Sequence, residues 1–263
     1  MLALKFSRTG RYAATALPAK GVTDYGQQFF TRFIKQTGVR RFINFSDDEH
    51  AMVALKEAAA RACEGVEHTS QACPKGDHAA NGHIENTVRE LKRQMRVLRL
   101  NLEKKLRQYN PNAKFTKLDD ADPVLFWMPE FAANAIACYR KGPDGKTPYE
   151  REFGRTWKKQ PFQYGENISI REAVERGSGA VKRDWDPRNV EGRYVGHHWK
   201  TGAVLILTSD GLKHGLGGMK LPVEQRWTLE GWDTLRGLPW DVRTRQRRTE
   251  HTFTDVEAQQ EAQ

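Results

Sequence analysis

Residues 41–49 read Arg41-Phe42-Ile43-Asn44-Phe45-Ser46-Asp47-Asp48-Glu49, and this stretch decides how the fold is interpreted. Its apolar and aromatic residues are typical of a β-strand, and we expect a short buried strand over residues 41–45. That strand delivers a carboxylate at its C-terminal end. In open α/β sheets this edge is where sites are built, so the acidic cluster is the first candidate for chemistry.

The segments on both sides of this strand predict an α/β order of elements. Upstream, Arg8-Thr9-Gly10 separates two apolar runs and indicates a hairpin turn, and Thr23 can cap a helix that Gly38 closes. The expected elements are strands over 1–6 and 12–17, a helix over 24–36, the strand over 41–45, a helix over 50–62, a short strand over 66–70, and helices over 82–105 and 124–139. Together they describe an α/β domain.

The helix over 82–105 carries two neighbouring stripes. At about 100° per residue, the apolar stripe consists of Ile84, Val88, Leu91, Met95, Leu98 and Leu102. The adjoining stripe, displaced by about a quarter turn, consists of Glu85, Arg89, Lys92, Arg96 and Arg99. One carboxylate therefore leads a row of cations along a helix whose other face is expected to be core.

This arrangement suits phosphoryl transfer on a polymer. Carboxylates from different elements can converge on Mg²⁺, which prefers oxygen ligands, while the basic row holds the phosphodiester backbone. Plainer interpretations stay open at this point. Asp48 can be the N-cap of the next helix, Glu85 suits the positive end of a helix dipole, and a basic stripe is commonly a solvated face.

The character of the chain changes after about Phe162. Six of the seven tryptophans lie beyond residue 150, and strands are expected over 167–171, 192–198 and 203–208, with a hairpin signal at Ser209-Asp210-Gly211. We interpret this region as a small, separate β-rich domain, followed after Arg243 by a polar tail. Its tryptophans can stack on bases, but large aromatics more commonly fill a core, which we favour.

Composition narrows the class of partner. The 263 residues carry 43 Lys+Arg against 33 Asp+Glu, a formal charge of +10, which favours a polyanion such as nucleic acid. Three widely spaced cysteines do not suggest a disulfide scaffold, and no apolar run approaches the roughly 20 residues needed to span a bilayer. We expect a soluble, intracellular protein with no membrane partner. Cys63, Cys73, His78 and His83 lack the closely paired spacing of a structural zinc site, so no zinc is expected.

The acidic motifs resemble those of a known family. Ser46-Asp47-Asp48-Glu49 with Asn81-Gly82-His83-Ile84-Glu85 is similar to the second and third acidic positions of the retroviral integrase superfamily, and more closely to integrases of copia-type LTR retrotransposons. In this chain 37 residues separate Asp47 from Glu85. Further segments that resemble the family are Leu17-Pro18-Ala19-Lys20-Gly21, residues 144–150, Gly192-Arg193-Tyr194-Val195-Gly196 and residues 236–240.

The resemblance implies a fold and a site. It implies an α/β, RNase H-like catalytic core lacking its first strand over residues 1–160, a small SH3-like β-barrel that grips DNA over 161–242, and a disordered tail over 243–263. It also implies that Asp47 and Glu85 are the catalytic and metal-binding residues, with Asp48 as the alternative to Asp47. The metal would be Mg²⁺ or Mn²⁺, and Arg89, Lys92, Arg96 and Arg99 would bind nucleic acid.

The family places its first catalytic aspartate on a strand before the hairpin formed here by residues 1–17. The only acidic residue before Asp47 is Asp24, which is expected at a helix start and cannot substitute. We therefore expect an integrase-derived protein for DNA integration by metal-dependent strand transfer, inactive alone, with exposed sheet edges and apolar faces. The alternative is a non-catalytic nucleic-acid-binding relic. Double-stranded DNA is the expected partner; a homo-oligomer and a nuclear location are compatible with this interpretation.

Overall fold

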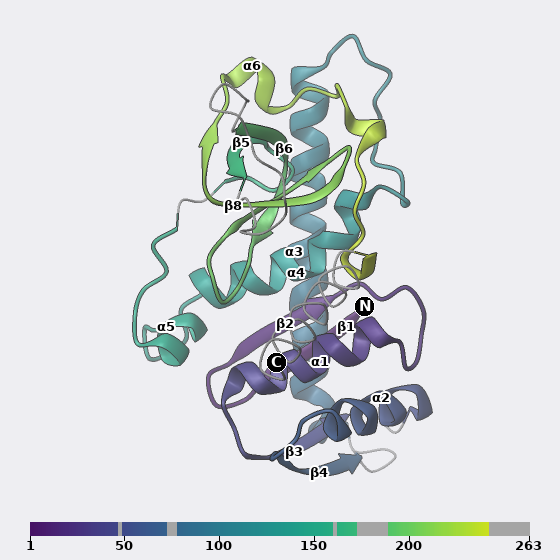
Figure 1. Ribbon diagram of the computed structural model, residues 1–263, viewed down its shortest axis with the longest axis vertical. Helices are drawn as coiled ribbons and strands as arrows, with labels where there is room; N and C mark the ends of the chain where they lie inside the picture. Colours follow the sequence, from purple (N-terminus) through teal and green to yellow (C-terminus); the bar gives the residue numbers. More distant parts are fainter. Residues whose placement is uncertain (47–48, 73–77, 160–161, 173–188, 242–263) are drawn as a thin grey trace, which may run out of the picture.

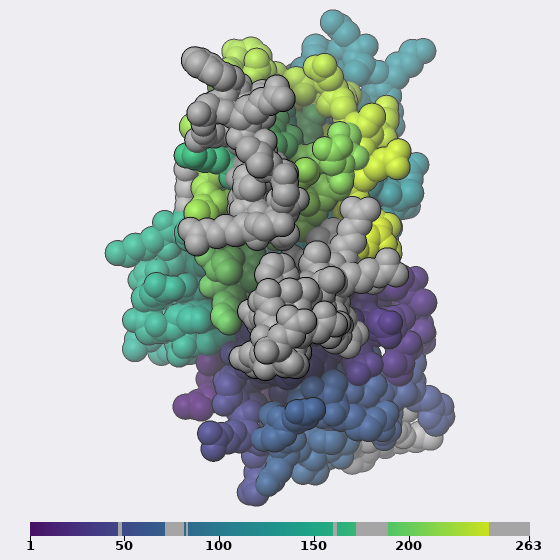
Figure 2. All heavy atoms as spheres, in the orientation of Figure 1, coloured from purple at the N-terminus to yellow at the C-terminus, as the bar shows by residue number. Residues whose placement is uncertain are grey.

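The computed structural model describes residues 1–46, 49–72, 78–159, 162–172 and 189–241. It is a mixed α/β structure in which one long helix, α3 (His78–Tyr109), runs along most of the molecule. Figure 1 shows two small sheets at one end of α3 and a β-barrel at the other. In the space-filling view of Figure 2, the segment from β3 to β4 correspondingly forms one end of the molecule.

The first elements follow the sequence pattern closely. Strands β1 (Leu2–Phe6) and β2 (Arg11–Thr15) pair as an antiparallel hairpin, as predicted. Helix α1 (Asp24–Thr37) begins after Thr23, whose hydroxyl accepts a hydrogen bond from the Gly26 amide at 3.1 Å. It ends at Gly38, whose φ of 68° is the left-handed conformation that glycine adopts without strain. Both predicted helix caps are confirmed.

A second, parallel pair of strands follows. Strands β3 (Arg41–Ser46) and β4 (Glu67–Ala72) are joined through helix α2 (His50–Arg61). Within the described residues, β3 and β4 form a sheet of their own, which is not hydrogen-bonded to β1 and β2. Apolar side chains of β1, α1 and α2 nevertheless share one core cluster, against which Phe42 of β3 also packs.

The expectation of a buried strand at residues 41–45 is wrong. Ile43 and Phe45 are each 57% exposed, because one face of β3 packs toward the core and the other is not covered by any described element. Only Phe42 among its apolar side chains joins the core. The alternative assignment of Asp48 as the N-cap of α2 is also replaced, since the N-cap residue is Glu49, without a side-chain cap hydrogen bond.

The two helices that follow carry the central core. Helix α3 extends beyond the predicted 82–105 at both ends, and the stripe predicted to be apolar core faces inward, with Leu91 and Leu102 fully buried. Helix α4 (Pro123–Tyr139) packs against α3, β2 and β6. Short helix α5 (Pro148–Phe153) begins with a reciprocal capping box between Thr147 and Glu150.

The predicted β-rich region is a closed barrel of four antiparallel strands. They are β5 (Asn167–Glu172), β6 (Asn189–His197), β7 (Val204–Thr208) and β8 (Gly211–Lys220). The predicted Asp-Gly hairpin is confirmed, since Thr208 pairs with Gly211 across the turn between β7 and β8. Because β8 pairs back with β5, each strand of the barrel has a partner on both edges.

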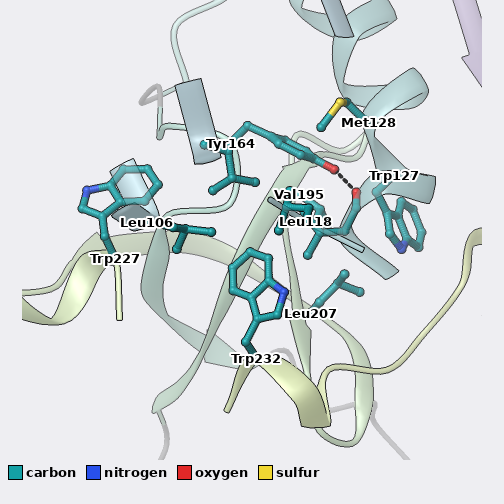
Figure 3. Packing of buried hydrophobic residues seen from close by; sticks show 11 residues of the cluster. Leu106, Leu118, Trp127, Met128, Tyr164, Val195, Leu207, Trp227 and Trp232 are labelled. Atoms are coloured by element: carbon teal, nitrogen blue, oxygen red, sulfur yellow. Dashed lines mark hydrogen bonds between the residues drawn. The ribbon is translucent and has the colours of Figure 1, made fainter. Parts of the chain in front are cut away.

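The largest core cluster lies between the barrel and the helices α3 and α4. Helix α6 (Val223–Arg226) and the 3₁₀ turn η1 (Trp232–Thr234) follow the barrel and bring Trp227 and Trp232 into this cluster. Figure 3 shows Tyr164, Trp227 and Trp232 around the aliphatic side chains, with the Tyr164 hydroxyl donating a hydrogen bond to the Val124 carbonyl. The interpretation of the tryptophans as core residues is confirmed for Trp199, Trp227 and Trp232.

Some predictions fall outside the described residues: the polar tail over 243–263, and Trp185. The division of the chain at residues 160 and 242 remains a prediction. In the part of the chain that the structure describes, no helix is both long and apolar enough to cross a bilayer.

Candidate functional site

The C-terminal ends of β3 and β4 lie side by side. Ser46, the last residue of β3, is paired in register with Ala72, the last residue of β4. Asp47 and Asp48 follow Ser46 directly in the chain but lie outside the described residues. The predicted convergence of Asp47 with Glu85 on a shared ion therefore stays a prediction, whereas the strand end that precedes Asp47 is defined.

A buried lysine lies at this strand end. Lys56 of α2 is only 1% exposed, and its Nζ donates a hydrogen bond to the Ser46 hydroxyl at 3.0 Å. Burying an ammonium costs free energy unless polar or negatively charged partners compensate its charge. The buried Lys56 therefore marks a position where such groups can lie close to the end of β3. Sequence reasoning missed Lys56. The only signal was its position on the helix beside Leu55 and the alanines that form the buried face.

Glu85 lies in the early turns of α3 with its side chain exposed. Helix α3 begins at His78, six residues after the end of β4, and Figure 1 shows its first turns at the end of the molecule that holds β3 and β4. A carboxylate is a suitable oxygen ligand for Mg²⁺ or Mn²⁺. Among the described residues, which omit Asp47 and Asp48, no group of three or more His, Cys, Asp or Glu side chains gathers as a metal site.

A second acidic residue on α3 has a different environment. Glu90 accepts a hydrogen bond from the Tyr12 hydroxyl at 2.6 Å and forms an ion pair with Arg140 at 2.7 Å. Burial raises the pKa of Glu90, but the hydrogen bonds from Tyr12 and Arg140 outweigh it, and the net pKa is lowered. Glu90 thus ties α3 to β2 and to the end of α4. Glu85 makes no such tie in the described residues, so its carboxylate is accessible.

The predicted basic row divides into two parts. Arg89, Lys92 and Arg96 are exposed on α3 and present their charges to solvent. Arg99 instead binds within the fold: its guanidinium pairs with Glu103 and Asp120, each at 3.0 Å, and donates to the Leu118 carbonyl at 3.0 Å. The accessible part of the row is therefore the half nearer to Glu85.

Comparisons with known proteins give a limited result. No protein-family model and no curated protein matches the chain. Among solved structures, the chain is similar to the catalytic core domain of BIV integrase, with 17% identity over 58% of this chain and 84% of that chain and a TM-score of 0.36. It is also similar to a chain of the simian T-cell lymphotropic virus intasome in complex with the PP2A regulatory subunit B56 gamma. There the identity is 16% over 89% of this chain and 70% of that chain, with a TM-score of 0.37.

Proposed function

We propose that this protein is derived from an integrase and that its DNA-processing site lies where β3 ends and α3 begins. Asp47 and Glu85 would hold a divalent ion there, and Arg89, Lys92 and Arg96 would bind the DNA backbone. The observation that carries this proposal is the order of elements at one sheet edge. The parallel strands β3 and β4 end side by side, and an acidic cluster follows β3 in the sequence. Helix α3, which carries the exposed Glu85, begins six residues after the end of β4.

The charged and polar groups beside this sheet edge support the proposal of a site in which carboxylates hold a divalent ion. The buried Lys56 ammonium lies beside Ser46 and would balance carboxylates at the next positions of the chain. A divalent ion held by two carboxylates would polarise a phosphodiester and activate the attacking oxygen. The protein's own contribution would be to fix those carboxylates and to hold the DNA strand by the cations of α3.

The divided sheet supports a further part of the proposal, namely that an additional strand completes the core between β1 and β3. Two-stranded sheets are marginally stable alone, and parallel strands are normally buried on both faces. Here β3 leaves Ile43 and Phe45 exposed, and the buried Asn44 Nδ2 has no hydrogen-bond partner among the described residues. A strand paired with the other edge of β3 would supply backbone partners and, in the integrase pattern, the first acidic residue.

The test is to supply that strand. We expect that extending the protein at its N-terminus by an apolar strand carrying one Asp yields Mg²⁺- or Mn²⁺-dependent joining of DNA ends to a target duplex. The matched control is the same extension with Asn in place of Asp. Asp47→Asn or Glu85→Gln in the extended protein should abolish joining, while Glu90→Gln should retain more of it. A folded, extended protein that stays inert with both metals would contradict the catalytic proposal.

A non-catalytic nucleic-acid-binding function is the second candidate, favoured by the exposed cations of α3, which need no metal to bind phosphates. It predicts duplex binding that weakens steeply with salt and is unchanged by Glu85→Gln. Arg96→Ala should reduce the salt slope by about 1, whereas Arg99→Ala should change it less because Arg99 is engaged within the fold. Duplex binding that is absent or independent of salt would exclude this function.

A further inference from the structure

The outer face of helix α3 carries two apolar side chains among cations. Val97 and Leu100 are 60% and 56% exposed, and because they are three residues apart they are neighbours on one side of the helix. Arg93 lies four residues before Val97 and Lys104 four residues after Leu100, so both extend the same line of side chains, and both are exposed. We call these four residues the outer stripe.

The outer stripe points away from the core of the molecule. At about 100° per residue, Leu100 lies on the opposite side of the helix from Leu91, which is fully buried. Within the part of the chain that the structure describes, the ion pairs on α3 involve Glu90, Arg99 and Glu103, and no residue of the outer stripe takes part in one. The outer stripe therefore combines exposed apolar surface with positive charge that the described fold does not neutralise.

Two kinds of partner fit the outer stripe poorly. Nucleic acid would use Arg93 and Lys104 for its phosphates but would leave Val97 and Leu100 without a contact, because backbone contacts are polar. A second copy of α3 would place these cations against the same cations of its partner, and like charges at such distances repel. A suitable partner instead carries apolar side chains at a similar spacing with carboxylates beside them.

The sequence of this chain contains such a partner. Residues 249–263, which we call the acidic segment, lie outside the described residues and contain no Lys or Arg. Phe253 and Val256 are three residues apart, as Val97 and Leu100 are. The acidic residues of the segment are Glu250, Asp255, Glu257 and Glu261. In charge and in apolar spacing, the acidic segment is the complement of the outer stripe.

The chain comes close to α3 before the acidic segment begins. Trp240 packs edge-on against Phe126 of α4 with ring centres 5.4 Å apart, and the next residue of α4, Trp127, shares a core cluster with Leu102 of α3. The eleven residues 242–252 span about 36 Å when extended. A helix with its side chains is only about 10–12 Å in diameter, so the acidic segment can pass around α3 to its outer face.

We propose that the acidic segment docks on the outer stripe of the same molecule, with its apolar pair against Val97 and Leu100 and its carboxylates against Arg93 and Lys104. Exposed ion pairs contribute little one by one, but the covalent linker holds the acidic segment near α3 at a millimolar effective concentration, so a weak contact is occupied. The docked segment would also screen the neighbouring Arg96 and weaken DNA binding. Only this last consequence rests on the proposed function.

Zero-length coupling with a carbodiimide, applied to the full chain, tests the contact because it joins a carboxylate and an amine that touch. We expect an amide between Lys104 and the acidic segment that is about fivefold more abundant in mass spectrometry than one with Lys92. Lys92 is the matched control, since it is also exposed on α3 but lies about a third of a turn away around the helix axis. Similar coupling to both lysines would show that the segment does not dock and would overturn the proposal.

The apolar part of the contact is tested by Leu100→Gln, which removes apolar surface without changing the charge. Coupling to Lys104 should fall by about threefold. Leu216→Gln is the control, because Leu216 on β8 is 82% exposed and lies outside the outer stripe, and it should leave the coupling unchanged. Undiminished coupling in Leu100→Gln would show that charge alone holds the segment and would overturn the proposed geometry.

Mixing isotope-labelled and unlabelled chains distinguishes a contact within one molecule from a contact between two copies. We expect the linked peptides to come from chains of the same label. Linked pairs of mixed label in the statistical proportion would overturn docking within one molecule.

The effect on DNA is measured separately, by duplex binding of the double variant Asp255→Asn, Glu257→Gln. It should bind about threefold more tightly than the wild type at low salt, because fewer carboxylates screen the cations of α3. Unchanged duplex binding would overturn the screening of Arg96, while the amide with Lys104 would still support docking. Duplex binding that is absent in both proteins would instead contradict the proposed nucleic-acid function.

Discussion

The two β regions of this protein solve the problem of strand edges in different ways. In the barrel, β5 to β8 close on themselves, so their backbone groups are paired on both edges and Ile168, Ile170 and Ile206 are fully buried. At the other end, β1–β2 and β3–β4 are two separate pairs, and β3 leaves Ile43 and Phe45 half or more exposed. Apolar strand residues alone do not produce burial; a neighbouring strand or helix on each side must be present.

The largest expected effect comes from making one substitution in both regions. Ile206→Ala in β7 removes a side chain with no exposed surface and should lower the free energy of unfolding by about 4 kcal/mol, through lost burial and a cavity. Ile43→Ala in β3 should change it by less than about 0.5 kcal/mol, because its side chain is 57% exposed. Chemical denaturation of both variants measures the difference, and equal losses would show that the outer face of β3 is covered.

Periodicity predicted most of the elements, because helix and strand patterns are local properties of the chain. Thr23 and Gly38 marked the ends of α1, and Asp210-Gly211 marked the hairpin between β7 and β8. The exposure of Ile43 was not predictable in this way. Whether an apolar residue is buried depends on what covers it, and the covering elements are distant in the sequence or absent from the described residues.

The candidate site was predictable only in part, for a similar reason. The alternation of charge and apolar residues predicted correctly that Arg89 is exposed on α3 beside an apolar stripe. It did not predict that Arg99 is engaged by Asp120, twenty-one residues away, or that Lys56 is buried at Ser46. Such contacts depend on tertiary packing, which a helical period does not encode. The pairing of Asp47 with Glu85 remains a prediction.

The second largest change in the free energy of unfolding is expected where the β1–β2 hairpin contacts the barrel end of the molecule. Arg11 of β2 is 4% exposed, pairs with Glu152 of α5 at 2.8 Å, and stacks on Trp199, two residues after the end of the barrel strand β6. Arg11→Met should lower the free energy of unfolding by about 3 kcal/mol, because it leaves the Glu152 carboxylate buried without a cation. Denaturation of this variant at several pH values gives the magnitude and its pH dependence.

The sign of that pH dependence follows from Glu152. Burial raises its pKa although Arg11 opposes the rise, so removing Arg11 raises the pKa further. A glutamate with a raised folded-state pKa destabilises the fold as the pH rises above its usual range, so the loss should be smallest in acid and grow toward neutral pH. The double variant Arg11→Met, Glu152→Gln should recover part of the stability. A loss independent of pH, with no recovery in the double variant, would show that Arg11 acts through packing alone.

The smallest expected effect is a loss of folding stability in acid, which is tested by substituting one histidine in each region. His197 at the end of β6 has a pKa lowered to about 4, mainly by burial and further by Lys159, and His68 on β4 is exposed. A base with a lowered folded-state pKa stabilises the fold above its ordinary pKa of 6.5, and this stability is lost as the pH falls toward 4. Allowing for water at the partly buried ring, the loss attributable to His197 over this range should be about 2 kcal/mol. His197→Gln should therefore flatten the acid limb of the stability profile, measured by denaturation between pH 7 and pH 4.5, while His68→Gln should leave it unchanged. If both variants keep the wild-type slope, the acid sensitivity lies in carboxylates and the closed barrel does not exclude the imidazolium.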